Sequence, residues 1–182
     1  VPLLGASQLP WLLRLVDDKS GHVRSSALAA TRIAVLDADT ALERMSSWLN
    51  DREPLNRTSA LVCAVIAAIG DRAWSAAYPT LLDDDELARS VIQSLSAREQ
   101  AYSLSETHTV ELWELAYTLF PPETDPDMMG VHAVGVREQV AFFRDRLLPA
   151  VASLGSPAAL EALQSLADRR PSERWIRRYV AQ

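Results

Sequence analysis

Apolar residues recur along most of this chain at intervals of three and four positions, the spacing of amphipathic helices. Leu9, Leu12, Leu13 and Val16 show this spacing near the N-terminus. Runs of alternating β-branched residues are absent, glycine is scarce, and most prolines fall at segment edges. The pattern predicts an all-α fold. Capping residues, a first-turn proline and a terminal glycine place helix boundaries at Ser7, Ser20, Asp39 or Thr40, Pro54 and Gly70.

The second half follows the pattern less regularly. Pro79 should kink or shorten the helix that Asp71 caps, and Pro149 should break another. The Gly155-Ser156-Pro157 segment predicts a helix end followed at once by a new start. The longest predicted loop covers 121–135. Helices are predicted over about 87–95, 107–120, 136–154, 157–168 and 172–182.

One segment of the chain has a second, similar copy further along the sequence. Residues 24–36 read RSSALAATRIAVL, and residues 57–69, thirty-three positions later, read RTSALVCAVIAAI. In both copies an aspartate stands six residues before the arginine, as Asp18 before Arg24 and Asp51 before Arg57. The same spacing returns as Asp168 and Arg174. A pair of helices that cannot bury its apolar faces alone can do so by stacking on a similar pair.

This pattern resembles HEAT-like repeats, on the strength of Asp18-x5-Arg24-x2-Ala27-Leu28 and its second copy from Asp51. The resemblance implies a right-handed α-solenoid of about five antiparallel helix pairs. It also implies that the aspartates and arginines form a structural ladder along the turns. On this basis 1–182 is a single repeat domain, with clear repeats at 9–37 and 40–70, a less regular part at 71–153, and a last repeat at 156–182.

Residues 154–180 are similar in style to HEAT-like regions of large multidomain bacterial proteins, including some signalling NTPases. This similarity implies that any ATPase lies outside the segment. No G-x4-GK[ST] phosphate loop occurs in the sequence. Because the chain starts at Val1 rather than methionine, we expect it to be a fragment of a longer protein.

Composition and net charge limit the binding partners and the cellular compartment that we expect for this chain. The net charge of −6 argues against nucleic acids and anionic membranes as partners. No apolar run is long enough to span a bilayer. The single cysteine, Cys63, lies in an apolar run and is expected to be a buried thiol in a reducing compartment. A cytoplasmic location is the resulting expectation.

Catalytic and metal-binding motifs are weak. His108 and Glu111 share a helix face, but no second such pair completes a metal site. The acidic loop from Glu123 has Met128 and Val134 where an EF-hand needs glycine and glutamate. No G-x-S-x-G nucleophile motif occurs. We therefore expect no cofactor, no metal and no enzymatic activity.

The C-terminus differs in charge from the rest of the chain. Residues 169–182 contain five arginines and one acid. On an α-helix Arg174, Arg177 and Arg178 would share one face, opposite an apolar face that includes Trp175. The arginines are candidates for contact with phosphate or an acidic partner, although a simple solvated face is the alternative. Met128 and Met129 are further candidate contact residues.

These observations lead to two hypotheses. The first is a non-catalytic protein-interaction or scaffold module, as a sensor or regulatory region of a larger protein. Its partner would be a protein or another domain of the parent chain, with self-association through the C-terminal helix as a further prediction. The alternative is a ligand-binding or enzymatic HEAT-like domain, resembling phycobilin lyases or base-excision glycosylases, with a pocket formed by residues 98–136.

Overall fold

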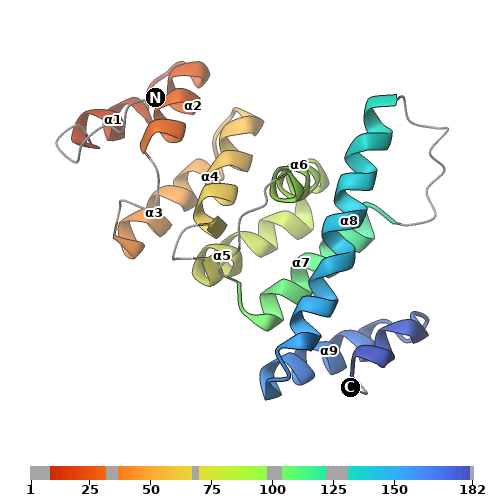
Figure 1. Ribbon diagram of the computed structural model, residues 1–182. Helices are drawn as coiled ribbons and strands as arrows, with labels where there is room; N and C mark the ends of the chain where they lie inside the picture. The colour runs from red at the N-terminus through yellow and green to blue at the C-terminus, as the bar shows by residue number, and fades with distance from the viewer. Residues whose placement is uncertain (1–8, 32–36, 67–69, 98–103, 122–130, 181–182) are drawn as a thin grey trace. The chain divides into compact units, whose positions relative to one another are not determined.

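The structure is a computed structural model that describes residues 9–31, 37–66, 70–97, 104–121 and 131–180 (Figure 1). Within these ranges the chain forms helices and no strands, which confirms the predicted all-α class. No helix in the described ranges is both long and apolar enough to cross a membrane. The helices are α1 (Leu9–Leu15), α2 (Gly21–Thr31), α3 (Ala38–Trp48), α4 (Pro54–Ile66), α5 (Gly70–Asp83), α6 (Asp85–Ser96), α7 (Glu106–Leu119), α8 (Val131–Ser153), α9 (Pro157–Arg169) and the 3₁₀ helix η4 (Arg174–Tyr179).

The chain divides into two compact units. Unit 1 comprises Val1–Val91 and Gln100–Ser103, and unit 2 comprises Ile92–Glu99 and Leu104–Gln182. The division falls inside α6. This division does not test the repeat boundaries predicted from the sequence, and they stay predictions.

In unit 1, successive helices pack on one another. Helix α2 packs on α1 and α4, and α4 also packs on α3 and α5. Helix α3 packs on α5. Helix α3 therefore contacts both the next helix and the helix after that, whereas α2 contacts α4, two helices later.

In unit 2, α7 lies at the centre. It packs against α8 and α9, and these two helices also contact each other. The short helix η4 packs on α9 and α8. The C-terminal segment is thereby held against its own unit.

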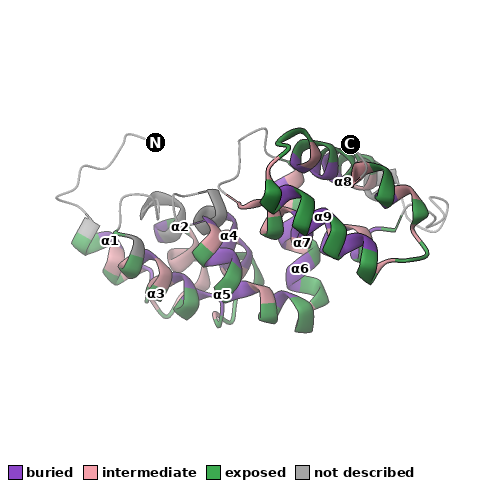
Figure 2. Ribbon diagram, turned by 90° about the horizontal axis from the view of Figure 1, so that it is seen from below, coloured by how far each residue is buried: buried purple, intermediate pink, exposed green. Residues whose placement is uncertain are grey.

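The cores are formed by the predicted apolar positions, drawn purple in Figure 2. Met45, Leu61 and Trp74 are fully buried in unit 1, and Trp113 and Leu163 are fully buried in unit 2. Burying one such side chain contributes about 1.5–3 kcal/mol. Trp11 departs from its expected packing role, because 59% of its surface is exposed.

Several predicted boundaries are confirmed. Gly155 has a positive φ of 59°, and the hydroxyl of Ser156 accepts a hydrogen bond from the backbone N–H of Ala159. Pro157 follows as the first residue of α9. The predicted start of the third helix was wrong by two or three residues: Asp37 is its cap, and its carboxylate accepts from the N–H of Thr40. Gly70, predicted to end the fourth helix, is the first residue of α5, so Asp71 lies in the first turn of that helix and the prediction that it caps the helix was wrong. Ser7 lies outside the described residues.

The break predicted at Pro149 was wrong, and the helix with Pro79 is not shortened there. Helix α5 continues past Pro79 to Asp83, and α8 continues past Pro149 to Ser153. Each proline is exposed and has buried residues on both sides, such as Leu148 and Val151 around Pro149. Packing of the flanking turns compensates for the one backbone hydrogen bond that each proline removes. Helix α8 also starts earlier than predicted, at Val131.

The predicted C-terminal α-helix was also wrong. The segment Arg174–Tyr179 is a single 3₁₀ helix. A 3₁₀ helix has three residues per turn, so residues three apart are aligned. Arg174 and Arg177 therefore form one ridge, while Arg178 is aligned with Trp175. The three arginines do not share one face.

Candidate functional site

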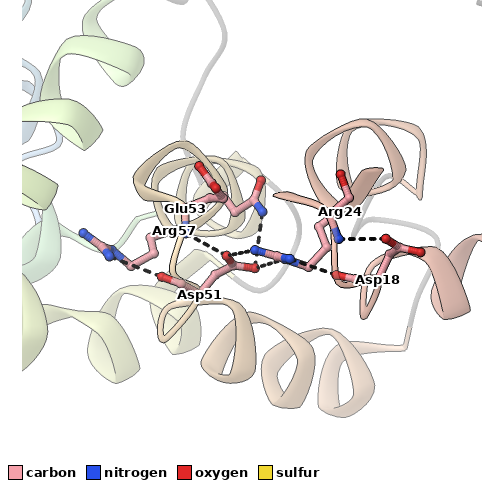
Figure 3. Close-up of polar contacts among 7 residues, drawn as sticks. Asp18, Arg24, Asp51, Glu53 and Arg57 are labelled. Atoms are coloured by element: carbon pink, nitrogen blue, oxygen red, sulfur yellow. Dashed lines mark hydrogen bonds and ion pairs between the residues drawn. The ribbon is translucent and has the colours of Figure 1, made fainter. Parts of the chain in front are cut away.

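The turns of unit 1 carry a chain of polar contacts (Figure 3). The carboxylate of Asp18 accepts a hydrogen bond from the backbone N–H of Ser20 at 2.8 Å. The carboxylate of Asp51 accepts one from Glu53 at the same distance. Each aspartate thus fixes the turn in which it lies.

The arginines join each turn to the next. Arg24 donates to the carbonyl of Asp18 at 2.8 Å and, with two further nitrogens, to both carboxylate oxygens of Asp51 at 2.6 Å. Arg57 occupies the equivalent position, donating to the carbonyl of Asp51 at 3.2 Å and lying 3.7 Å from the carboxylate of Asp84. Each arginine thus contacts the carbonyl of the aspartate six residues before it, and its carboxylate partner belongs to the following turn. These contacts form the ladder that the resemblance implied for these turns.

The first of these pairs is shielded from solvent. Only 15% of the Arg24 side chain and 8% of the Asp51 side chain are exposed. The bond from Arg24, followed by bonds from Glu53 and Asn56, lowers the pKa of Asp51 from 3.8 to about 2 despite burial, which acts in the opposite direction. This contact stabilises unit 1, and the four hydrogen bonds to the Asp51 carboxylate leave it no acceptor site for a ligand.

Unit 2 contains a different feature, a cluster of aromatic rings. Trp113 stacks on Tyr117 with ring centres 4.8 Å apart, and Trp175 meets Trp113 edge-on at 5.7 Å. Tyr179 meets Trp175 edge-on at 6.3 Å. A tryptophan followed four residues later by a tyrosine occurs three times in the chain, and the sequence analysis did not recognise this spacing. In α-helices the spacing stacks the rings, as at Trp113, whereas the 3₁₀ turn at Trp175 rotates them to 81°.

The aromatic cluster borders a cleft of about 490 Å³. Its buried lining residues are Trp113, Arg144 and Leu148, and the three rings of Tyr117, Trp175 and Tyr179 are partly exposed. Asp145, Pro149 and Arg178 are its exposed lining residues. The cleft therefore combines apolar ring surface with charged groups.

The polar groups within the cluster are satisfied internally. The carboxylate of Glu173 accepts from the indole N–H of Trp175 at 2.7 Å and from the hydroxyl of Tyr117. Burial, followed by this bond to Glu173, raises the pKa of Tyr117 above its ordinary value. Tyr117 therefore remains a protonated donor at neutral pH.

Three arginines near the cleft are also bonded to other groups of the protein. Arg144 is buried, donates to the carbonyl of Phe120 at 2.8 Å, and forms an ion pair with Asp145 at 2.9 Å. Arg169 and Arg170 both pair with the carboxylate of Glu114, at 2.9 and 3.0 Å. These contacts attach the end of α9 to α7.

The three arginines of η4 differ. Arg174, Arg177 and Arg178 are exposed, and none forms an ion pair with a carboxylate in the described part of the chain. Arg178 donates to the backbone carbonyl of Trp175 and lies 5.7 Å from the centre of its ring. It is thus held beside the cleft while its terminal nitrogens stay accessible. The predicted basic surface therefore consists of the ridge of Arg174 and Arg177 and, beside it, Arg178.

The other candidate residues are not part of this site. Met128 and Met129 lie outside the described residues, as does the side chain of Cys63. No group of three or more histidine, cysteine, aspartate or glutamate residues in the described ranges is arranged to hold a metal ion.

No known protein family, curated protein sequence or solved structure matches this chain.

Proposed function

We propose that this chain is a non-catalytic interaction module, built as a short HEAT-like α-solenoid, that binds a protein partner or another domain of its parent protein through the surface of η4. One observation carries the proposal. Arg174, Arg177 and Arg178 are exposed together without a carboxylate partner in the described ranges, whereas Arg144, Arg169 and Arg170 nearby are all paired.

The solenoid part of the proposal rests on unit 1. Arg24 and Arg57 make equivalent contacts to the aspartates of successive turns. Helix contacts there follow the order of the sequence. Ladders of this kind stabilise stacked helix pairs, which present an extended surface to partners. A reducing, cytoplasmic setting fits the lone Cys63 and belongs to the proposal.

The proposal is tested by affinity capture from an extract of the cells that express the protein. The immobilised wild-type chain is compared with the double variant Arg174→Glu/Arg177→Glu. The matched control is Arg14→Glu/Arg52→Glu, which changes the net charge equally at two exposed positions of unit 1. We expect a bound protein that is lost with the first variant and retained with the control. Retention of every captured protein by the first variant would contradict the proposal.

A second candidate function is binding of a small ligand, and the cleft is the observation that favours it. A volume of about 490 Å³ lies within the range of ligand-binding pockets, about 300–1,000 Å³. Only Trp113 and Tyr117 of its lining belong to the predicted 98–136 region. A thermal-shift screen of small aromatic acids tests this function, since a bound ligand raises the unfolding temperature by an amount that grows with the logarithm of its concentration over Kd.

A further inference from the structure

We propose that the cleft of unit 2 receives an aromatic side chain from an acidic segment of the partner protein, while the arginines of η4 bind the flanking carboxylates. This inference rests on the proposed function and specifies the chemistry of the partner. It combines two observations, the composition of the cleft and the charge beside it.

Inside the cleft, the hydrogen-bond donors of Tyr117, Trp175 and Arg144 are already bonded to other groups of the protein. Tyr117 and Trp175 already direct their donors to Glu173, and the nitrogens of Arg144 are bonded to Phe120 and Asp145. A polar group placed there would lose its bonds to water without replacement. The exposed ring surface instead favours an apolar, planar group, because aromatic rings gain from edge-on and stacked contacts beyond the area they bury.

The cleft also excludes a cationic occupant. Aromatic faces attract cations, but in this cluster the guanidinium groups of the protein already occupy such positions. Arg144 and Arg170 lie 5.6 and 5.2 Å from the ring centre of Tyr117, and Arg178 lies 5.7 Å from that of Trp175. A lysine or a quaternary ammonium group would meet like charge here.

The surface beside the cleft favours carboxylates. Arg174 and Arg177 lie one 3₁₀ turn apart, about 6 Å along the helix axis. The acid nearest in sequence, Glu173, is already bonded to Tyr117 and Trp175. Arg174 and Arg177, which have no carboxylate partner in the described ranges, and the terminal nitrogens of Arg178 therefore give a local positive charge on a chain whose net charge is −6. Arginine forms paired hydrogen bonds to carboxylates, so an acidic segment is the complementary partner.

The inference is tested with synthetic peptides and fluorescence anisotropy. The probe is a short, capped peptide of aspartates and glutamates with one central phenylalanine. Two matched peptides carry alanine in place of phenylalanine, or asparagine and glutamine in place of the acids. We expect the first peptide to bind about tenfold more tightly than either of the others, and binding to weaken as salt is added.

Variants of the protein separate the two parts of the site. Arg174→Glu/Arg177→Glu should weaken binding of the phenylalanine peptide at least tenfold, whereas Arg14→Glu/Arg52→Glu should change it less than about twofold. Tyr179→Ala should weaken the phenylalanine peptide severalfold and leave the alanine peptide unchanged, which isolates the ring contact as in a double-mutant cycle. Circular dichroism of each variant checks that the helices are retained. Arg178→Gln provides a second test, because it removes the charge but keeps a polar side chain, and it should also weaken binding of the phenylalanine peptide.

Three results would overturn the inference. These are equal affinity for the phenylalanine and alanine peptides, equal affinity for the acidic and neutral peptides, and no binding up to about 1 mM. If one of these occurs while affinity capture still depends on Arg174 and Arg177, the interaction function stands and only the partner chemistry is wrong. If capture does not depend on these arginines, the proposed function fails as well.

Discussion

The two units use arginine in different ways. In unit 1, Arg24 and Arg57 lie within the turns, where each contacts the backbone of its own turn and the carboxylate of the next. In unit 2, Arg169 and Arg170 make a comparable structural contact to Glu114, but Arg174 and Arg177 contact no carboxylate in the described ranges. Arginine content alone therefore does not indicate a binding surface; the surface of η4 is distinguished by three exposed arginines within five residues, without a carboxylate partner in the described ranges.

The largest expected effect is the loss of the link at Asp51. Asp51→Ala removes the two short bonds from Arg24 and leaves a mostly buried guanidinium without its partner. We expect unit 1 to lose about 2–4 kcal/mol in its free energy of unfolding. Urea unfolding followed by circular dichroism measures this change.

The matched control is Asp17→Ala. Asp17 also pairs with an arginine twenty-seven positions later, Arg44, but 57% of its side chain is exposed. Its removal should change the free energy of unfolding by no more than about 0.5 kcal/mol. Equal losses in the two variants would show that the pair formed by Arg24 and Asp51 has no special structural role.

The same pair predicts a dependence of stability on pH. The pKa of Asp51 is about 2 in the folded protein and 3.8 in the reference state, so its ionised form stabilises the fold above about pH 4. This contribution should disappear as the pH falls from about 4 to about 2. After allowance for screening it amounts to roughly 1–2 kcal/mol. Urea unfolding measures the free energy of unfolding of the wild type and of Asp51→Asn at several pH values in this range. The difference between the two free energies should shrink as the pH falls. A difference that stays constant would contradict the stabilising role of the ionised Asp51.

Local capping also stabilises unit 2, and Ser156 tests this. Its hydroxyl caps α9 and also donates to the carboxylate of Glu106 at 2.9 Å. Ser156→Ala should lower the free energy of unfolding of unit 2 by about 1 kcal/mol. The control, Ser153→Ala, removes an exposed hydroxyl that bonds only within its own helix turn, and it should have little effect on urea unfolding. A larger loss in the control would contradict the capping role.

The smallest effect on stability is expected for the arginines of η4. Arg174→Glu/Arg177→Glu should leave the free energy of unfolding within about 0.5 kcal/mol of the wild type, because both side chains are exposed and unpaired. Thermal unfolding measures this. A loss comparable with that of Asp51→Ala would mean that these arginines are structural, and the contrast between the units would disappear.

Much of the fold could be predicted from local sequence. The helical spacing, the cap at Ser156 and the equivalence of Arg24 and Arg57 are short-range patterns that correspond directly to helix and turn geometry. The third aspartate of the ladder, Asp84, could also have been found, because it lies thirty-three positions after Asp51. Asp84 was not recognised as the equivalent of Asp51 because it lies in a run of four acidic residues, Asp83 to Glu86.

The remaining features depend on tertiary packing. Helix α8 tolerates Pro149 because residues on both sides of it are buried, and this is not visible in the local sequence. The 3₁₀ form of η4 separates Arg178 from Arg174 and Arg177, which an α-helical projection had placed together. The aromatic cleft brings α7, α8 and η4 together from distant parts of the sequence. The four-residue spacing of tryptophan and tyrosine is the one local sequence feature that indicates the aromatic cluster beside the cleft.

Hydrogen exchange of the chain, alone and with its captured partner bound, tests most directly where the contact lies. Protection should increase at the backbone amides of η4 and of the part of α8 around Asp145, while the turns at Asp18 and Asp51 stay unchanged. Protection confined to the turns of unit 1, with η4 unaffected, would contradict the assignment of the contact surface to the free arginines.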